Sequence, residues 1–160
     1  MTTQAPPQEP RTVQVVGQPL RRKEDARVIT GQTRWTDNLT WPGLLHLAIV
    51  RSPLAHARIT GADVSAALER PGVVAAFTGR GLAPEYGSLP TAWNVSNDLI
   101  VPDHLPIATE EAHHLGDAVA VVVAEGAYQA ADAVEAVQVE YDPLPAVVDM
   151  TAALDPKHHW

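Results

Sequence analysis

The sequence predicts an α+β fold in which short helices pack on a mixed β-sheet. Residues 44–50 form an almost unbroken apolar run that is too short to span a membrane and is typical of a buried strand. Residues 118–124 contain only valine and alanine, which favours a second buried strand. Between 127 and 137, apolar residues recur with helical spacing. Strands and short helices therefore follow one another along a single chain.

A corner is predicted between the first two strands, where Ser52 precedes Pro53. The strand before the corner is apolar throughout and is expected to be buried on both faces. The strand after the corner alternates, so Ala57 and Ile59 are expected to face the core. The side chains expected to face outward are His56, Arg58 and Thr60.

The later elements follow from the same two periodicities. Asp63 is expected to cap a short helix over 65–68, because its side-chain oxygen can accept hydrogen bonds from the free backbone donors there. The helix over 127–137 has one apolar stripe, which consists of Ala130, Ala133, Val134 and Val137. The remaining predicted strands are 73–77, a weakly alternating 107–115, 118–124 and 137–142.

One compact domain is expected, because 160 residues suit a single hydrophobic core. It is predicted to cover 13–150, after a disordered proline-rich arm at 1–12 and before a linker or truncated tail at 151–160. The first part of this domain is expected to contain a short edge strand, an exposed connector and an extended segment. These lie at 13–16, 21–29 and 34–37.

Residues 80–106 have no regular period, because prolines and glycines interrupt them throughout. Loops of this length are uncommon in compact domains unless they bind something. Two interpretations are equally supported: a contact with other protein, or a variable insertion.

The composition excludes several classes of function. The net charge of -8 argues against binding a phosphate backbone, and the short basic run at 21–23 is interpreted as a solvated cluster rather than a nucleic-acid or lipid contact. The chain has no cysteine, which excludes disulfides and thiolate metal sites within it. It has no secretory signal and no apolar run long enough to span a membrane, so a cytoplasmic location is expected.

The residues give little support for a cofactor or metal site. Gly79 and Gly81 follow a predicted strand, but Pro84 stands where the third glycine of a dinucleotide fingerprint would open a helix. His113 and His114 lie close to His104 in the sequence, yet neighbours in a strand point to opposite faces and cannot easily bind one ion together. Solvent-facing or interface histidines are the favoured interpretation.

A catalytic triad is only formally possible. Ser52, His56 and Asp37 provide the residue types, but Ser52 precedes a proline rather than lying in a glycine-flanked nucleophile elbow. The sequence therefore predicts no catalytic, cofactor-binding or metal-binding residue in this chain.

A series of short motifs resembles one known family. They occur in its order over about 14–149, nearly the whole chain, and the combination is more specific than any single piece. The motifs are Thr30-Gly31, Trp35-Thr36-Asp37-Asn38-Leu39, Pro42-Gly43-Leu44-Leu45-His46, Arg51-Ser52-Pro53, His56-Ala57-Arg58-Ile59, Pro71-Gly72-Val73, Thr78-Gly79, Val119 to Glu125 and Glu140-Tyr141-Asp142-Pro143-Leu144-Pro145. With these motifs the chain resembles the α/β hammerhead domain at the N-terminus of the molybdopterin-binding large subunit of molybdenum hydroxylases, which include xanthine dehydrogenase, aldehyde oxidase and aerobic carbon monoxide dehydrogenase.

The resemblance implies a structural role in a larger oxidoreductase. Such enzymes hydroxylate aldehydes or aromatic heterocycles, or oxidise carbon monoxide, at a molybdenum–pterin centre, and iron–sulfur clusters and FAD lie on partner domains or subunits. The family's pterin-binding segments and base glutamate belong to later domains, and no residue here matches them. The expected partners are the remaining domains of the large subunit and the iron–sulfur and flavin subunits. The residues expected to contact them are Arg51, Ser52, His56, Arg58 and Trp93.

Two departures from the family pattern concern local geometry. Before the valine strand, members usually have an aromatic-Val-Gly-Glu-Pro turn, where this chain has 114–118 as His-Leu-Gly-Asp-Ala, and Leu54 replaces a common histidine. Two functions are retained: a scaffold domain of a molybdenum hydroxylase large subunit, as a fragment or truncated gene product, and a free-standing non-catalytic interaction module. An independent hydrolase or metalloenzyme has almost no support.

Overall fold

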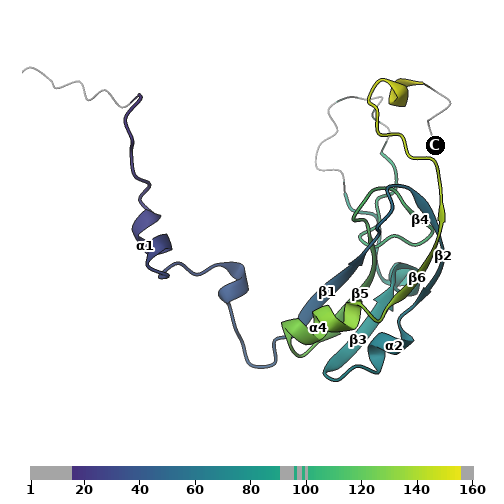
Figure 1. Cartoon of the computed structure of the whole chain (residues 1–160), viewed down its shortest axis with the longest axis horizontal. Coiled ribbons are helices and arrows are strands. Elements are labelled where there is room, and N and C mark those ends of the chain that lie inside the picture. Colours follow the sequence, from purple (N-terminus) through teal and green to yellow (C-terminus); the bar gives the residue numbers. More distant parts are fainter. Residues whose placement is uncertain (1–15, 91–95, 97–98, 100, 156–160) are drawn as a thin grey trace, which may run out of the picture. The chain divides into compact units, whose positions relative to one another are not determined.

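The computed structural model describes residues 16–90, 96, 99 and 101–155 (Figure 1). It divides the chain into two compact units, one ending at Trp41 and the other beginning at Pro42. The predicted edge strand at 13–16 lies outside the described residues except for Val16, which is in a turn. Among the described residues, no helix has the length and apolar character needed to cross a membrane.

Between residues 16 and 41, the N-terminal unit forms two short helical segments. Helix α1 (Asp25–Ile29) occupies the predicted connector, and its first residue pairs with Arg22 at 3.0 Å between Nε and Oδ1. The prediction of an extended segment at 34–37 is wrong for the second half of that range. Residues Thr36–Asn38 form the 3-10 helix η1, because the Asn38 side chain accepts a hydrogen bond from the Trp35 amide and closes a tight turn.

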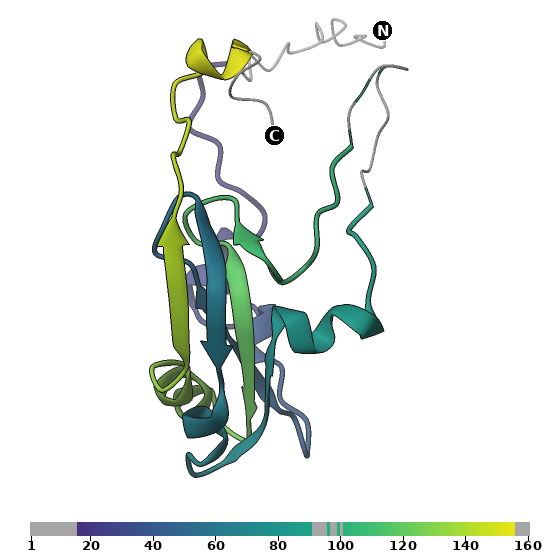
Figure 2. The same ribbon diagram turned by 90° about the vertical axis from the view of Figure 1, so that its right-hand side faces the viewer.

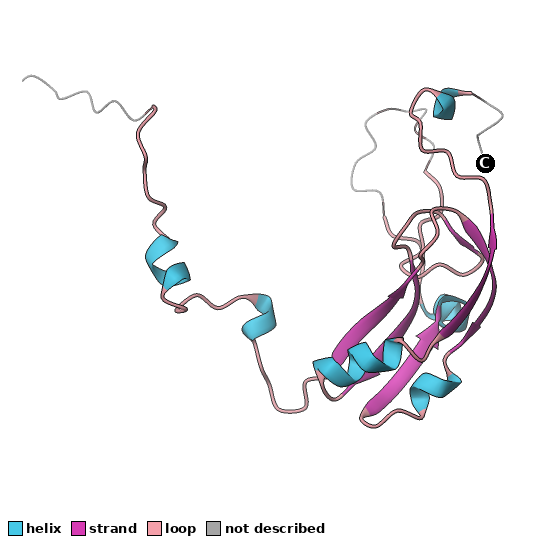
Figure 3. Ribbon diagram, viewed as in Figure 1, coloured by secondary structure: helices cyan, strands magenta, loops and turns pink. Residues whose placement is uncertain are grey.

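The described residues of the second unit form six strands in two three-stranded antiparallel sheets (Figure 3, magenta). The first sheet has the order β1-β5-β3 and the second has the order β4-β2-β6. The strands are β1 (His46–Arg51), β2 (Ala57–Asp63), β3 (Val73–Thr78), β4 (Glu111–Ala112), β5 (Ala118–Ala124) and β6 (Gln138–Pro143).

The α+β class is confirmed, but the prediction of one mixed sheet is wrong, because every described strand pair is antiparallel. The reason is the path of the helical connections. Helix α2 (Ser65–Leu68) links β2 to β3, and α4 (Ala127–Val134) links β5 to β6. Each connection passes from one sheet to the other, so neither produces the parallel neighbours that a crossover within one sheet would give.

The core of the first sheet lies under helix α4. Strand β5 is central, and Val122 is fully buried against Ala67, Ala76 and Ala133. Figure 1 shows α4 lying against β1 and β5, and the small alanine side chains between them permit this close approach. The predicted strand 118–124 is confirmed, and so is the helix beginning at 127, although it ends at Val134 instead of 137.

The other face of this sheet is only partly covered. The prediction that β1 is buried on both faces is wrong, because Leu47 is 59% exposed. Leu47 and Ala75 both pair with Val123, so these side chains share the face that points away from α4. Toward the other end of β5, Val119 and Val121 on the same face are buried. We call the uncovered part the open face; it consists of Leu47, Ile49, Ala75, Phe77 and Val123.

The second sheet confirms the alternation predicted for β2. Ala57 and Ile59 are buried, whereas Arg58 and Thr60 are exposed. The short helix at 65–68 is also confirmed, and Asp63 Oδ1 accepts from the Ser65 amide at 2.8 Å. The predicted strand 107–115 shortens to β4, because the Ala108 amide instead donates to the Ala118 carbonyl of the other sheet.

Residues 80–106 begin with regular structure, which contradicts the prediction that they lack it throughout. Helix α3 (Gly79–Leu82) and the 3-10 helix η2 (Ala83–Glu85) follow β3 directly and project to one side of the strands (Figure 2, teal). The Thr78 hydroxyl caps α3 by accepting from the Gly81 amide at 3.1 Å. Tyr86 then ties this segment back to the domain, since its hydroxyl lies 3.1 Å from the Ile107 carbonyl and 3.3 Å from that of Gly79.

We expect Tyr86→Phe to lower the free energy of unfolding by about 1 kcal/mol, because two carbonyls lose their shared donor. Burial raises the pKa of the Tyr86 phenol above its ordinary value. Its contribution is therefore complete while the phenol is neutral and is lost as the pH rises through that raised pKa. Urea denaturation at pH 8 and above pH 10 should show the difference between wild type and Tyr86→Phe shrinking, whereas a difference independent of pH would contradict this role. Tyr128→Phe, at an 88% exposed residue, is the control.

Candidate functional site

The corner after β1 is built around Ser52. Its side chain is buried, its amide donates to the Asp117 carbonyl at 2.8 Å, and its hydroxyl lies 2.9 Å from the Leu54 carbonyl. Gly116 donates back to the Ser52 carbonyl, also at 2.8 Å. These bonds join the corner to the turn before β5, so the Ser52 side chain serves the chain's own structure and has no surface for a partner. Arg51 is exposed, and its guanidinium donates to the Gly116 carbonyl at 2.9 Å.

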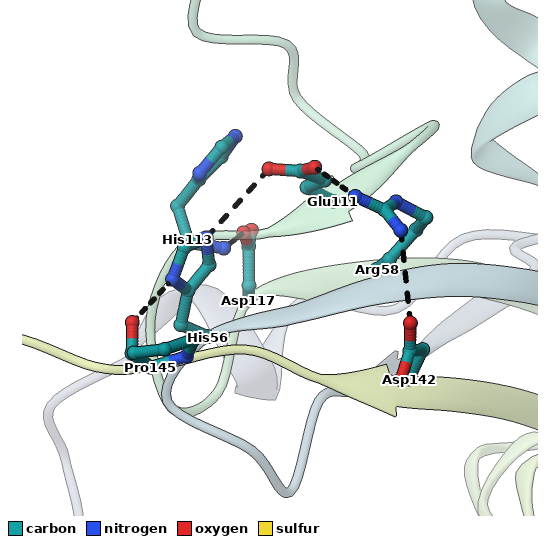
Figure 4. A network of polar contacts seen from close by, with 7 residues as sticks. All are labelled: His56, Arg58, Glu111, His113, Asp117, Asp142 and Pro145. Atoms are coloured by element: carbon teal, nitrogen blue, oxygen red, sulfur yellow. Dashed lines mark hydrogen bonds and ion pairs between the residues drawn. The ribbon is translucent and has the colours of Figure 1, made fainter. Parts of the chain in front are cut away.

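Arg58 lies in the middle of an exposed polar row across the second sheet (Figure 4). It is directly opposite Glu111 of β4 and Asp142 of β6, because β2 is the central strand. The guanidinium nitrogens lie 3.8 Å from Glu111 Oε1 and 3.6 Å from Asp142 Oδ2. The Arg58 side chain is 54% exposed, so each pair contributes at most about 1 kcal/mol. Its guanidinium is accessible to a partner.

His56 lies just before β2 and is held from two sides. Its Nδ1 is 2.8 Å from the Pro145 carbonyl, and its Nε2 is 3.6 Å from Glu111 Oε2. The His113 ring stacks on the His56 ring with a centroid distance of 6.1 Å. The three side chains of His56, Glu111 and His113 therefore converge on one point, and each offers one donor atom within 4.8 Å of the other two.

Sequence reasoning missed this grouping. It treated His113 with His114, and the structure confirms that these neighbours diverge, since His114 Nδ1 lies 3.7 Å from Asp117 while His113 meets His56. His113 lies next to His56 because of the β2–β4 register, which places Ala57 opposite Ala112. That long-range register has no signal in the local periodicity. The Ser52 and His56 of the formal triad lie in the second unit, whereas Asp37 belongs to the N-terminal unit.

A pocket of about 590 Å³ adjoins the histidines. Glu111 and His113 form part of its wall, and residues 102–105 of the long loop form another part. Four acidic residues line it: Asp103, Glu110, Glu111 and Asp117. The pocket therefore favours cations over phosphate groups. Of the residues predicted to contact partners, Arg51, His56 and Arg58 lie around this end of the second unit, and Trp93 is outside the described residues.

Two small antiparallel sheets, with helices on one face and an open apolar face on the other, define an α+β domain of the hammerhead type. The chain belongs to the family described as "Aldehyde oxidase and xanthine dehydrogenase, a/b hammerhead domain", whose model matches residues 30–145. The resemblance to the hammerhead domain and the α+β class predicted from the sequence are thereby confirmed.

Proteins similar to this chain include subunits of larger enzymes that are much longer than it. It is 44% identical over 135 residues to the carbon monoxide dehydrogenase large chain of Hydrogenophaga pseudoflava, covering 84% of this chain and 16% of that protein. It is 35% identical to the nicotine 6-hydroxylase large subunit of Paenarthrobacter nicotinovorans, and the match covers 88% of this chain and 17% of that protein. Quinoline 2-oxidoreductase from Pseudomonas putida 86 matches with a TM-score of 0.76 and 38% identity over 85% of this chain and 17% of that one. The chain thus spans about a sixth of the length of these relatives.

Proposed function

We propose that this chain is the structural and assembly domain of a molybdenum hydroxylase large subunit, with catalysis in other domains of that subunit. The observation that carries the proposal is the 44% identity to a carbon monoxide dehydrogenase large chain of which these residues cover only 16%. The names of the relatives support an oxidation of carbon monoxide, an aldehyde or a nitrogen heterocycle for the whole protein.

The histidine-lined pocket does not fit the molybdenum cofactor of such an enzyme. A pterin cofactor carries phosphate, and the histidine-lined pocket presents four carboxylates that would repel it. The sequence also has no cysteine to bind iron–sulfur clusters. We therefore assign molybdopterin to other domains of the large subunit, and iron–sulfur clusters and FAD to partner domains or subunits. We also propose a cytoplasmic location for this protein.

The open face is the surface we propose for contact with the rest of the large subunit. Leu47 and Phe77 are 59% and 41% exposed on it, beside the half-buried Val123. Exposed large apolar side chains gathered on one face mark interaction surfaces. Arg51, His56 and Arg58, together with Trp93 and the 80–106 loop, would supply further contacts, while Ser52 supports the corner from inside. We propose domain boundaries at 13–150, with an arm at 1–12 and a tail at 151–160.

Intact mass and molybdenum content of the native gene product test this function. We expect these residues within, or tightly bound to, a polypeptide several times longer that contains molybdenum and molybdopterin-binding sequence. A native product consisting of the bare 160-residue chain, with no molybdenum protein bound, would contradict the proposal.

The alternative is a free-standing, non-catalytic interaction module that keeps the hammerhead fold. The separation of the chain into a compact second unit with its own buried alanine and valine core favours it. A monodisperse chain that melts cooperatively in isolation would support this alternative, whereas association through the open face would support the large-subunit domain.

Replacing Leu47 and Phe77 together by serine should separate the two functions. In the isolated chain, we expect less self-association by light scattering, because the exposed apolar area falls. In the full-length enzyme, we expect the opposite: a lower yield of assembled, molybdenum-containing protein. The matched control is Leu68→Ser, since Leu68 is 48% exposed on α2, away from the open face. Normal assembly of the double variant would show that the open face is not the contact.

A further inference from the structure

We propose that His56, Glu111 and His113 form a binding site for a divalent transition-metal ion such as Zn²⁺. Two imidazoles and one carboxylate are a common ligand set for this ion. The three donor atoms lie within 4.8 Å of one another (Figure 4). They come from the residue before β2, from β4 and from the residue after β4, so the paired strands fix their relative positions. The site goes beyond the proposed function and depends only on this chain.

The spacing of His56 and Glu111 suits a small ion. Tetrahedral ligands about 2.0–2.1 Å from zinc lie about 3.3 Å from one another. His56 Nε2 and Glu111 Oε2 are 3.6 Å apart, so a small side-chain rotation is enough to bring them to this spacing. Both side chains are largely buried, at 18% and 31% exposure, which limits the freedom that binding would remove.

The surroundings of His56 resemble those of a metal ligand. The Pro145 carbonyl can only accept a hydrogen bond, so Nδ1 carries the proton and donates it at 2.8 Å. In the neutral ring this leaves the lone pair on Nε2, the atom directed toward Glu111. A backbone carbonyl on the second ring nitrogen is the usual device that fixes the tautomer and orientation of a metal-binding histidine.

The charges around the site favour a cation. Glu111 and His113 line the 590 Å³ pocket together with the carboxylates of Asp103, Glu110 and Asp117. The pocket gives a route for the ion and space for a water molecule as a fourth ligand. Arg58 opposes binding, because its guanidinium already lies 3.8 Å from the second oxygen of Glu111.

Isothermal titration calorimetry of the untagged chain with ZnCl₂ at pH 7.5 tests the proposal. His158 and His159 are first replaced by glutamine, because adjacent terminal histidines bind zinc on their own. We expect about one ion per chain, and a Co²⁺ complex whose visible spectrum is that of a four- or five-coordinate ion. His113→Gln and Glu111→Gln should each weaken zinc binding at least about tenfold. Arg58→Gln should strengthen it, since a competing cation is removed.

His114→Gln is the matched control, because His114 adjoins His113 but points to Asp117. It should bind zinc as tightly as the parent chain, in which only His158 and His159 are replaced. Circular dichroism confirms that each variant is folded; His113 is exposed, so its replacement leaves the core intact. Stoichiometric zinc binding that survives both His113→Gln and Glu111→Gln, or no binding by the parent chain, would overturn the proposal.

Discussion

Replacing Gly79 by alanine is expected to lower the free energy of unfolding of the second unit by about 3 kcal/mol or more. A Cβ atom at this position would overlap the Ala108 carbonyl oxygen and would lie 2.8 Å from the carbonyl carbon. These are backbone atoms, which cannot rotate aside as a flexible side chain could. The neighbouring Ile107 side chain, at 3.1 Å, closes the remaining space.

The Ala108 backbone is not free to retreat from Gly79. Its amide donates to the Ala118 carbonyl at the start of β5 with a distance of 2.7 Å, so moving it disturbs the central strand of the first sheet. The Tyr86 hydroxyl, which bridges the Gly79 and Ile107 carbonyls, would lose its geometry as well. Relieving the clash at α3 would therefore displace residues that pack in the core.

Urea denaturation followed by circular dichroism measures the effect. The control is Gly87→Ala, because a Cβ atom at Gly87 would meet nothing within 4 Å. It should leave the unfolding midpoint almost unchanged. Equal midpoints for the Gly79 and Gly87 variants would show that α3 packs against Ala108 less closely than the structure has it.

The parts of the fold that the sequence predicts correctly are those with a local period. Ala57 and Ile59 alternate with exposed neighbours, and the structure buries both. The stripe at Ala130 and Ala133 predicts which side of α4 meets the sheet, and both residues are buried. In each case a residue's burial depends on its own element's geometry, which a short window of sequence contains.

The errors concern contacts between distant segments. The apolar run at 44–50 predicts burial but contains no information on how many faces are covered, and Leu47 proves exposed. The division into two sheets depends on where each helical connection leads, which no window of sequence specifies. His56 and His113 meet only because β2 pairs with β4 in one register, and a shift by one residue would turn one ring away.

The corner motif shows how a family signature can be explained by local physics. Ser52 is buried, and its backbone exchanges two hydrogen bonds with residues 116 and 117, so a small polar side chain is needed there for packing and turn geometry. The motif thus identified the family correctly, although the residue itself faces inward. Arg51 directly before Ser52 and Arg58 in β2 both have exposed side chains, which are accessible to another protein.

The two faces of β5 should respond very differently to a charge. Val122→Asp is expected to cost about 4 kcal/mol, because Val122 is fully buried against Ala76 and Ala133 and an ionised carboxylate there has no partner. Val123→Asp places the same group one residue further on, on the open face. We expect a cost of about 1–2 kcal/mol there, because water reaches the carboxylate and only strand propensity and partial packing are lost.

Chemical denaturation of the two variants of the isolated chain gives this comparison directly. The pair is internally matched, since both substitutions lie in the central strand and introduce the same charge. Similar losses would mean that something covers the open face in solution, such as a second copy of the chain, and self-association measured at several protein concentrations would identify it. Within the large subunit proposed above, we expect the cost of Val123→Asp to rise toward that of Val122→Asp, because the other domains of that subunit would exclude water from the same surface.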